Sequence, residues 1–378
     1  MKKICLFITE QFEPTADILI SELRRRNVPC VRWNLDKYPR GSSITYRFAD
    51  GFCGANITSD GRRVDVNDVA SIWCRGFRPL GFPQETSAAD RIFAETEAQR
   101  TLDALLTITD LVWVNHPHRY TLANSKPAQL FAAHRLGLRI PATVITNDPD
   151  AARLFLTSLP GPAIYKAMSQ NLELEPGKAL FTGIVRGHQT SKLDLIQLTP
   201  GVFQQYVEKD HELRITVVGS RIFAAKIDSQ THAEAKIDWR HIPLDLEHQT
   251  VTLPADLATK IHAFMGNFGL LYGAFDFIVT TDNQYVFLEV NPDETNFLVG
   301  SRDILLRVFW ISKIVQGHAA IGAKRHVILG NLIILRHVRI EIVFPVEFTD
   351  RRDVAAKHEA REHRHAQRFV VHHRQRAG

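Results

Sequence analysis

A hairpin with opposed acidic residues constrains this chain more than any other feature of its sequence. Residues 273–279 and 285–290 are apolar and each is typical of a β-strand, and Asp282-Asn283 between them suits a two-residue hairpin turn. With that turn, Asp276 stands directly opposite Glu289. Like charges in such a pair destabilise a sheet unless something neutralises them, so the hairpin predicts a bound cation.

Asn291 extends the acidic pair into a set of three oxygen ligands. It lies two residues beyond Glu289 and therefore on the same face of the strand. Carboxylate and amide oxygens suit Mg²⁺, whose shell is completed by water and phosphate oxygens. Asp276, Glu289 and Asn291 are therefore candidate magnesium ligands. The alternative is a solvent-facing acidic strand pair in which Asn291-Pro292 forms a turn.

The rest of the chain divides by its pattern of strands and helices. Residues 1–120 alternate short apolar strands with amphipathic helices, the order of a mainly parallel α/β sheet. From there to about residue 310, antiparallel runs of strands are interspersed with helices, as in an α+β protein. The composition, 45% hydrophobic and 23% charged, excludes a disordered or fibrous protein. No apolar run approaches the roughly 18 residues of a membrane span.

The net charge is concentrated at the C-terminal end. The whole chain has a formal charge of +5, but residues 311–378 hold 13 Lys and Arg against 6 Asp and Glu. The body is therefore slightly acidic, and only the basic tail points to an acidic or nucleic-acid partner. The four cysteines lie within the first 74 residues without CxxC spacing, which favours reduced thiols in a cytoplasmic protein over disulfides or a zinc site.

Two lysines are candidates for binding a nucleotide phosphate. The chain contains neither a GxxxxGK[ST] loop nor GxGxxG, so a nucleotide would bind without a P-loop. Lys126 stands at the start of a predicted helix, and Lys166 lies within an apolar strand, where an unpaired charge is costly. Lys166 therefore needs an anion, which is either a nucleotide phosphate or the carboxylate of a structural salt bridge.

Three further cations and one strand end complete the candidate site. Residues 202–208 are predicted to form an apolar strand with a polar end. This end can offer backbone groups to an adenine edge and a carboxylate to a ribose. The alternative is an ordinary strand end. Arg214 and Lys226 each alternate with apolar residues, which predicts that both face away from the core. With Arg240 they can line a positive floor for a substrate carboxylate and for developing phosphate charge. The alternative is a solvated strand face.

The order of these motifs resembles that of the ATP-grasp ligases, and within them the peptide maturases that form microviridin-type ester and amide rings (graspetides). The resemblance covers about residues 1–292. Its Phe-Asp and Leu-Glu-Val-Asn-Pro segments are specific for ATP-grasp enzymes, and Trp-Cys-Arg and Ile-Asp-Ser-Gln point to the peptide maturases. The segments that carry it are 71–79, 113–117, 123–130, 136–148, 203–219, 224–230 and 287–292.

The resemblance implies a pre-ATP-grasp α/β domain followed by a two-lobed ATP-grasp fold with ATP between its lobes. The expected parts are the N-terminal domain (1–120), the small lobe (121–200), the C-terminal lobe with the magnesium site (201–310) and an atypical basic tail (311–378). The implied cofactors are ATP and Mg²⁺, with two ions. The implied ATP-binding residues are Lys126, Lys166, Gln204, Gln205, Tyr206 and Val207 (the last four as the adenine hinge), and Glu212 for the ribose. The implied metal ligands are Asp276, Glu289 and Asn291, and the implied catalytic residues are Arg214, Lys226 and Arg240.

The resemblance further implies a two-step ligation in the cytoplasm. An Asp or Glu side chain of a ribosomal precursor peptide, built of a leader and an acidic, hydroxyl-bearing core, attacks the γ-phosphate to give an acyl phosphate and ADP. A Ser or Thr hydroxyl or a Lys amine of the same peptide then displaces phosphate and closes an ester or amide macrocycle. Neither a membrane nor a nucleic acid is an expected partner, and the resemblance is compatible with a homodimer.

The sequence also permits two other interpretations of its function, and one segment departs from the maturase pattern. Another carboxylate–amine ligase of this fold, glutathione-synthase-like or ribosomal-protein-modifying, would use the same residues. A non-catalytic nucleotide- or nucleic-acid-binding protein would use the basic tail. The sequence leaves the maturase pattern after Asn291-Pro292, where a small residue, Gln and an aromatic-rich stretch are usual. A reading-frame change near codon 293 is one hypothesis, and it would replace the native C-terminal helix.

Overall fold

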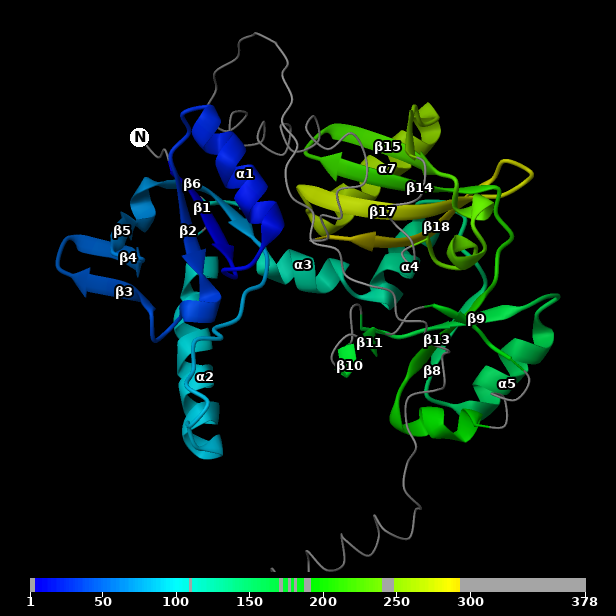
Figure 1. The fold of residues 1–378 in the computed structure, drawn as a ribbon, viewed down its shortest axis with the longest axis horizontal. Helices are drawn as coiled ribbons and strands as arrows, with labels where there is room; N and C mark the ends of the chain where they lie inside the picture. Colours follow the sequence, from blue (N-terminus) through cyan, green and yellow to red (C-terminus); the bar gives the residue numbers. More distant parts are fainter. Residues whose placement is uncertain are drawn as a thin grey trace, which may run out of the picture.

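The computed structural model describes residues 4–108, 111–169, 173–175, 178–179, 182–186, 192–239 and 248–292. Within these ranges an N-terminal α/β domain is followed by two lobes, each built on its own sheet (Figure 1). The predicted combination of α/β and α+β units is thereby confirmed. The bounds of the predicted domains stay predictions, and both the basic tail and the reading-frame hypothesis concern residues outside the described ranges.

A parallel four-stranded sheet forms the centre of the N-terminal domain, as the sequence pattern predicted. Its order is β2-β1-β6-β7, and all neighbouring pairs are parallel. Helix α1 (Pro14–Arg25) packs through Leu23 against Phe7 on one face, and α2 (Ala88–Asp103) packs through Leu102 on the other. The strands are β1 (Ile4–Thr9), β2 (Cys30–Asn34), β6 (Val69–Cys74) and β7 (Val112–Val114).

A three-stranded antiparallel sheet that was not predicted follows β2 in the chain. It consists of β3 (Ser42–Ala49), β4 (Phe52–Ser59) and β5 (Arg62–Asp65). Asp60 and Gly61 connect β4 to β5, both with positive φ, which is the two-residue turn that an Asp-Gly pair favours. This dipeptide was the available sequence signal for the hairpin. The four cysteines of the domain are free thiols, as expected.

The small lobe is an antiparallel sheet with one covered face. Its order is β12-β9-β13-β8. Helix α5 (Pro149–Ser158) and the residues after Lys192 cover one face around Phe203 and Leu193. The strands are β8 (Thr143–Thr146), β9 (Ala163–Lys166), β12 (Gly183–Ile184) and β13 (Gly201–Gln205); a separate pair is formed by β10 (Glu173–Glu175) and β11 (Lys178–Ala179).

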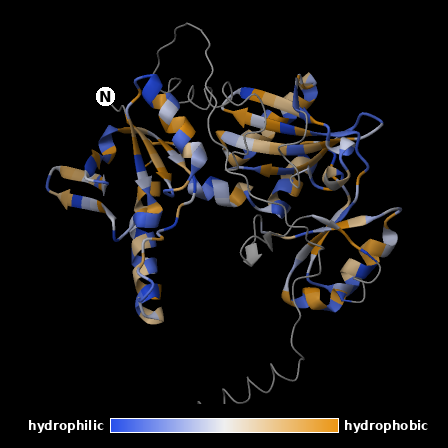
Figure 2. Ribbon diagram, in the orientation of Figure 1, coloured by the Kyte–Doolittle hydropathy of each residue, from blue (hydrophilic) through white to orange (hydrophobic). Residues whose placement is uncertain are grey.

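The large lobe is a five-stranded antiparallel sheet in the order β16-β15-β14-β17-β18. One face packs on α4 (Lys126–Arg135) and α7 (Ala255–Phe268) through a cluster that includes Phe264, Phe275 and Phe287. Figure 2 shows how hydrophobic residues dominate these strands. The opposite face carries the acidic residues described below. The strands are β14 (His211–Val218), β15 (Arg221–Ile227), β16 (His248–Val251), β17 (Tyr272–Val279) and β18 (Tyr285–Asn291).

The remaining described helices are short. Helix α3 (Pro117–Ala123) leads from the N-terminal domain to α4. Short 3₁₀ helices cover Leu35–Lys37, Val66–Asp68, Ala104–Thr107, Leu193–Leu198, Ser229–Thr231 and Ala233–Ala235. In the described part of the chain, no helix has the length and apolar character that a membrane crossing requires.

Asn115 joins the N-terminal domain to the large lobe. It follows β7 and is buried, and its Nδ2 donates to the carbonyl oxygens of Tyr272 and Pro292, both at 2.7 Å. Its Oδ1 accepts the N–H groups of Leu271 at 2.8 Å and Tyr272 at 3.1 Å. Since Pro292 directly follows Asn291, the carboxyl edge of the parallel sheet lies beside the end of β18.

Candidate active site

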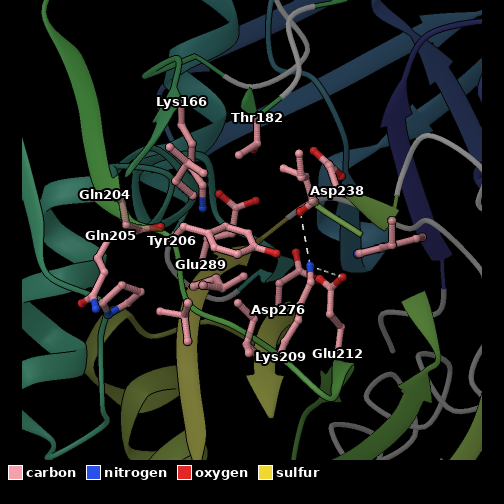
Figure 3. Close-up of a pocket in the computed structure, with 17 residues that line it drawn as sticks. Lys166, Thr182, Gln204, Gln205, Tyr206, Lys209, Glu212, Asp238, Asp276 and Glu289 are labelled. Atoms are coloured by element: carbon pink, nitrogen blue, oxygen red, sulfur yellow. Dashed lines mark hydrogen bonds and ion pairs between the residues drawn. The ribbon is translucent and has the colours of Figure 1, made fainter. Parts of the chain in front are cut away.

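A pocket lies between the open face of the small-lobe sheet and the polar face of the large-lobe sheet (Figure 3). It contains about 600 Å³ of empty space, which includes space open to solvent. Eight residues predicted to bind ATP or metal line it. The lining residues are Pro141, Ile164, Lys166, Thr182, Gln204, Gln205, Tyr206, Val207, Lys209, Glu212, Ile237, Asp238, Trp239, Asp276, Ile278, Leu288 and Glu289.

The pairing of β13 with β9 builds the small-lobe wall of the pocket. Gln204 is paired with Ile164, and Val202 with Lys166. Because side chains alternate along a strand, these four residues share one face of the sheet, while Phe203 points to the other and is buried against α5. The apolar strand β9 therefore brings the Lys166 ammonium to the pocket, where the sequence predicted that it needs an anion.

The acidic hairpin has the predicted pairing but a different turn. Asp276 and Glu289 are directly opposed in β17 and β18. The connection has three residues rather than two, because the N–H of Thr280 donates to the carbonyl oxygen of Gln284 at 3.0 Å. A β-bulge at Leu288 takes up the difference and restores the predicted opposition of the two carboxylates. The predicted turn is therefore wrong and the predicted pairing is confirmed.

The bulge also decides which side chains reach the pocket. Leu288 and Glu289 are consecutive, yet both line it, since the extra residue of a bulge interrupts strict alternation. In the turn, Asn283 has a left-handed φ of 60°, a conformation that asparagine adopts more readily than most residues. Asn283 was part of the predicted two-residue turn, and the residue which that prediction left out is Thr281.

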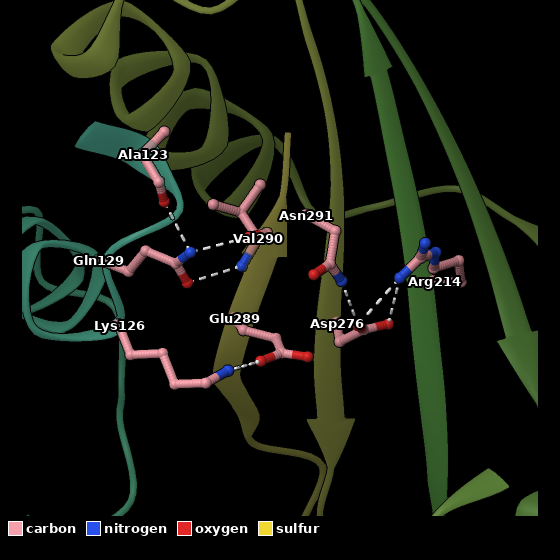
Figure 4. Close-up of polar contacts among 8 residues, drawn as sticks. All are labelled: Ala123, Lys126, Gln129, Arg214, Asp276, Glu289, Val290 and Asn291. Carbon is pink, nitrogen blue, oxygen red and sulfur yellow. Dashed lines mark hydrogen bonds and ion pairs between the residues drawn. The ribbon is translucent and has the colours of Figure 1, made fainter. Parts of the chain in front are cut away.

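The three predicted metal ligands lie on one face of the hairpin (Figure 4). Asn291 Nδ2 donates to Asp276 Oδ2 at 3.1 Å. Arg214 Nη1 donates to both carboxylate oxygens of Asp276, at 3.0 and 2.9 Å, and its side chain is only 4% exposed. On the neighbouring strand β18, Oε2 of Glu289 lies 2.6 Å from Nζ of Lys126, which belongs to helix α4. Cations of the protein itself therefore neutralise the opposed carboxylates.

The donor chemistry of this cluster fits Mg²⁺. Asp276 and Glu289 supply hard carboxylate oxygens and Asn291 a carboxamide, and Mg²⁺ keeps waters and phosphates in its shell, so few protein ligands are needed. Among the described residues, no three His, Cys, Asp or Glu side chains form a metal-binding group of their own. Because Lys126 and Arg214 balance the two carboxylates, we expect a metal ion to bind well only together with an anion such as a nucleotide phosphate.

Gln129 holds the helix of Lys126 against the strand of the metal ligands. It is 1% exposed, and its Nε2 donates to the carbonyl oxygens of Val290 at 2.8 Å and Ala123 at 2.7 Å. Its Oε1 accepts the N–H of Val290 at 2.9 Å. These bonds place α4 beside Glu289 (Figure 4). Gln129 was not predicted, because a glutamine three residues after a lysine is equally common on exposed helices.

The Gln129→Leu substitution is expected to lower the free energy of unfolding by about 1–3 kcal/mol, since it leaves buried backbone groups of Val290 and Ala123 unpaired. Urea unfolding measures the change. Gln99→Leu is the matched control, because Gln99 on α2 donates only to the neighbouring Asp103 in the described contacts. Equal losses in the two variants would contradict the assigned role of Gln129.

A buried ion pair that was not predicted lies on the large-lobe wall. Lys209 Nζ is 2.7 Å from Glu212 Oε1, and their side chains are 2% and 6% exposed. Lys209 also donates to the carbonyl oxygen of Ile237 at 3.2 Å. Burial raises the pKa of Glu212, and the Lys209 ammonium opposes that shift. Lys209 stands between Glu208 and Asp210, a charge run that in sequence resembles any solvated loop.

Lys226 does not share the pocket face with Arg214, contrary to prediction. Strands β14 and β15 pair Leu213 with Lys226, and directly paired residues point to the same side of a sheet. Lys226 therefore lies on the face of Leu213 and away from Arg214, where its Nζ is 2.8 Å from Asp228 Oδ1. The alternation of a single strand could not reveal this, because its register against β14 decides the face. Arg240 lies outside the described residues.

Comparisons with known proteins agree with this architecture. The family model described as the MvdD pre-ATP grasp domain matches residues 4–121. A RiPP-associated ATP-grasp ligase from Chryseobacterium gregarium, solved with ADP and a leader and core peptide, matches 84% of this chain and 98% of its own, with 28% identity and a TM-score of 0.76. This chain has the ATP-grasp fold. No curated protein matches its sequence significantly.

Two macrocyclases from Microcystis aeruginosa MRC also resemble this ATP-grasp chain. MdnC, solved with the precursor peptide MdnA, is 27% identical with a TM-score of 0.73, over 83% of this chain and all of its own. MdnB is 26% identical with a TM-score of 0.67, over 83% of this chain and 99% of its own. D-alanyl-alanine synthetase A from Vibrio cholerae, at 12% identity and a TM-score of 0.55, shares the fold alone.

Proposed function

We propose that this ATP-grasp protein is an ATP-dependent ligase that closes ester or amide macrocycles in a ribosomal precursor peptide. The observation that carries the proposal is the cluster of Asp276, Glu289 and Asn291, held by Lys126 and Arg214 at a pocket between the two lobes. The similarity to a RiPP-associated ligase and to two macrocyclases, one bound to its precursor peptide, supports a peptide as the substrate.

The small-lobe wall is proposed to bind the nucleotide. Gln204, Gln205, Tyr206 and Val207 line the pocket and would contact the adenine. Glu212 is the candidate for the ribose hydroxyls, and its ion pair with Lys209 orients the carboxylate. Lys166, together with Lys126 from the large-lobe side, would bind the phosphates.

The large-lobe wall is proposed to hold the metal. Asp276, Glu289 and Asn291 would ligate two Mg²⁺ ions. Bound together with ATP, these ions would neutralise charge on the phosphoryl group that is transferred. Arg214 keeps the Asp276 carboxylate in place through two hydrogen bonds. Its proposed contact with γ-phosphate or with a substrate carboxylate adds to that positioning role.

The proposed reaction has two steps, phosphoryl transfer to the peptide and ring closure. A peptide carboxylate oxygen forms a bond to the γ-phosphorus while the bond from that phosphorus to the β–γ bridging oxygen breaks, so ADP leaves and an acyl phosphate remains. A Ser or Thr hydroxyl, or a Lys amine, then bonds to the acyl carbon, inorganic phosphate leaves, and the nucleophile loses its proton. The residues supply orientation and electrostatic stabilisation. Each ring costs one ATP and removes one water from the peptide.

The test is incubation of the full chain with ATP, Mg²⁺ and a leader-plus-core peptide that contains Asp or Glu and Ser, Thr or Lys. We expect a mass loss of about 18 Da per ring, with one ADP formed for each. A core in which Asp and Glu are replaced by Asn and Gln should stay unchanged. ADP formation with an added amino acid, rather than lost water, would instead support a carboxylate–amine ligase that extends a chain.

A further inference from the structure

Two cysteines of the N-terminal domain stand side by side on adjacent strands. Cys5 on β1 and Cys30 on β2 are register partners in the parallel pair. Paired residues project from the same face of a sheet, and both cysteines pack against the cluster that contains Phe7 and Leu23. Both are partly exposed free thiols, and neither lines the pocket. The structure therefore places two thiols together on one face of the sheet, outside the candidate active site.

The geometry of this pair suits a disulfide. Neighbouring strands lie about 4.8 Å apart, within the range of about 4.4–6.8 Å that a disulfide requires between its Cα atoms. Strand β2 is at the edge of the described sheet, so a small shift of β2 toward β1 can bring the two sulfurs into bonding distance. The other two cysteines are placed differently. Cys53 is paired with Phe48 on β3, and Cys74 is paired with Ile8, which points to the opposite face of β1.

The surroundings of the two thiols decide which of them reacts first. Burial raises the pKa of Cys5 to about 12, and the neighbouring Cys30 thiol adds to that shift. Burial also raises the pKa of Cys30, but the Arg24 guanidinium beside it opposes that shift. The thiolate is the form that attacks a disulfide. Cys30 is therefore the attacking cysteine, and Cys5 is the one that closes the bond.

We propose that Cys5 and Cys30 are a redox modification site, at which a low-molecular-weight disulfide such as oxidised glutathione closes a reversible disulfide between β1 and β2. The Cys30 thiolate bonds to one sulfur of the small disulfide, and the other sulfur leaves as a thiolate. The Cys5 thiolate then bonds to Cys30 Sγ and displaces the second small thiolate. The two protons lost by the cysteines end on the two released thiols. The cysteine pair is thus oxidised by two electrons, and the small disulfide is reduced.

The disulfide locks the edge strand β2 to the centre of the N-terminal sheet. The face that carries it packs on α1 and also on Val218 and Tyr272 of the large lobe. Closing a loop of about 25 residues restricts the unfolded chain. We therefore expect the melting midpoint of the oxidised chain to rise by about 5 °C. The modification does not depend on the proposed ligase activity.

The test is oxidation of the folded full chain that carries Cys53→Ser and Cys74→Ser, so that Cys5 and Cys30 are the remaining thiols. The reduced protein is incubated with oxidised glutathione at about pH 8.5, where more thiolate is present, and is then treated with N-ethylmaleimide. We expect a mass loss of about 2 Da and no maleimide adduct. Dithiothreitol should restore both reactive thiols. A digest of the oxidised, unaltered chain should contain the Cys5–Cys30 cross-linked peptide.

Two further variants test the order of attack. Adding Cys5→Ser should trap one glutathione on Cys30, whereas adding Cys30→Ser should leave Cys5 as a free thiol. Thermal melting before oxidation establishes that each variant is folded. Maleimide labelling of both cysteines after oxidation, or one glutathione on each, would overturn the site, as would a digest of the unaltered chain without the cross-linked peptide. A disulfide that leaves the melting midpoint unchanged would overturn the locking of β2.

Discussion

The double variant Asp276→Asn/Glu289→Gln is expected to lose ring formation by at least about 10³-fold, because both carboxylate ligands of the proposed metal site become neutral. Even groups that only support a metal ligand are worth about 10–100-fold, and the transferring phosphoryl group depends on the metal for charge neutralisation. The assay is mass loss from the precursor peptide, together with the Mg²⁺ dependence of ADP binding. The variant should bind ADP with the same affinity with and without Mg²⁺.

The matched control for this variant is Asp256→Asn. Asp256 lies on α7 and is not among the residues that line the pocket, and its side chain is 78% exposed in a pair with Lys260. Ring formation should be unchanged there. The double variant also removes the two carboxylate charges that pair with Lys126 and Arg214, so its melting temperature must be measured beside its activity. Full ATP-dependent ring formation by the folded double variant would show that the metal assignment is wrong.

Replacing Arg214 with Met is expected to lower the free energy of unfolding by about 3–5 kcal/mol, since it leaves the Asp276 carboxylate without its buried counter-ion. The Arg214 side chain is 4% exposed and that of Asp276 15%, so water screens the pair only weakly. Adding Asp276→Asn to Arg214→Met should recover part of the loss, because the remaining group is neutral. Urea unfolding of the two single variants and the double variant measures this coupling.

Additive effects within about 0.5 kcal/mol would contradict the assigned pairing of Arg214 with Asp276. The control is Arg25→Met on α1, where the arginine side chain is 66% exposed and pairs with Glu22 along the helix. Surface ion pairs of this kind contribute little to the free energy of unfolding. The urea midpoint of Arg25→Met should therefore be almost unchanged. A large loss in the control would indicate a general effect of removing arginine.

The opposition of Asp276 and Glu289 could be predicted although the turn was not. The prediction missed both the third residue of the connection and the β-bulge at Leu288. The two omissions shift the register in opposite directions, so the predicted pairing is correct. Alternation and pairing are short-range rules that a single hairpin obeys by itself. The same rules predicted the wrong face for Lys226, because the sequence of each strand alone does not determine the register of β15 against β14.

The long-range contacts of the site were beyond sequence reasoning. Lys126 and Glu289 are 163 residues apart, and Gln129 reaches Val290 across a similar separation. Lys209 looks ordinary in sequence, because it lies in a charged loop. Its role depends on burial, since a buried polar group must find a partner and an exposed one need not.

By itself, the sequence determined the kinds of chemistry available to this protein: strands that carry Asp276, Glu289 and Lys166 on defined faces, and motifs in the order of an ATP-grasp protein. Only the tertiary structure decided which of these groups meet. It brought Lys126 and Arg214 onto the two carboxylates and turned Lys226 away. The physical reason is that strand alternation is local, whereas pairing of buried charges and amides is set by packing between distant segments.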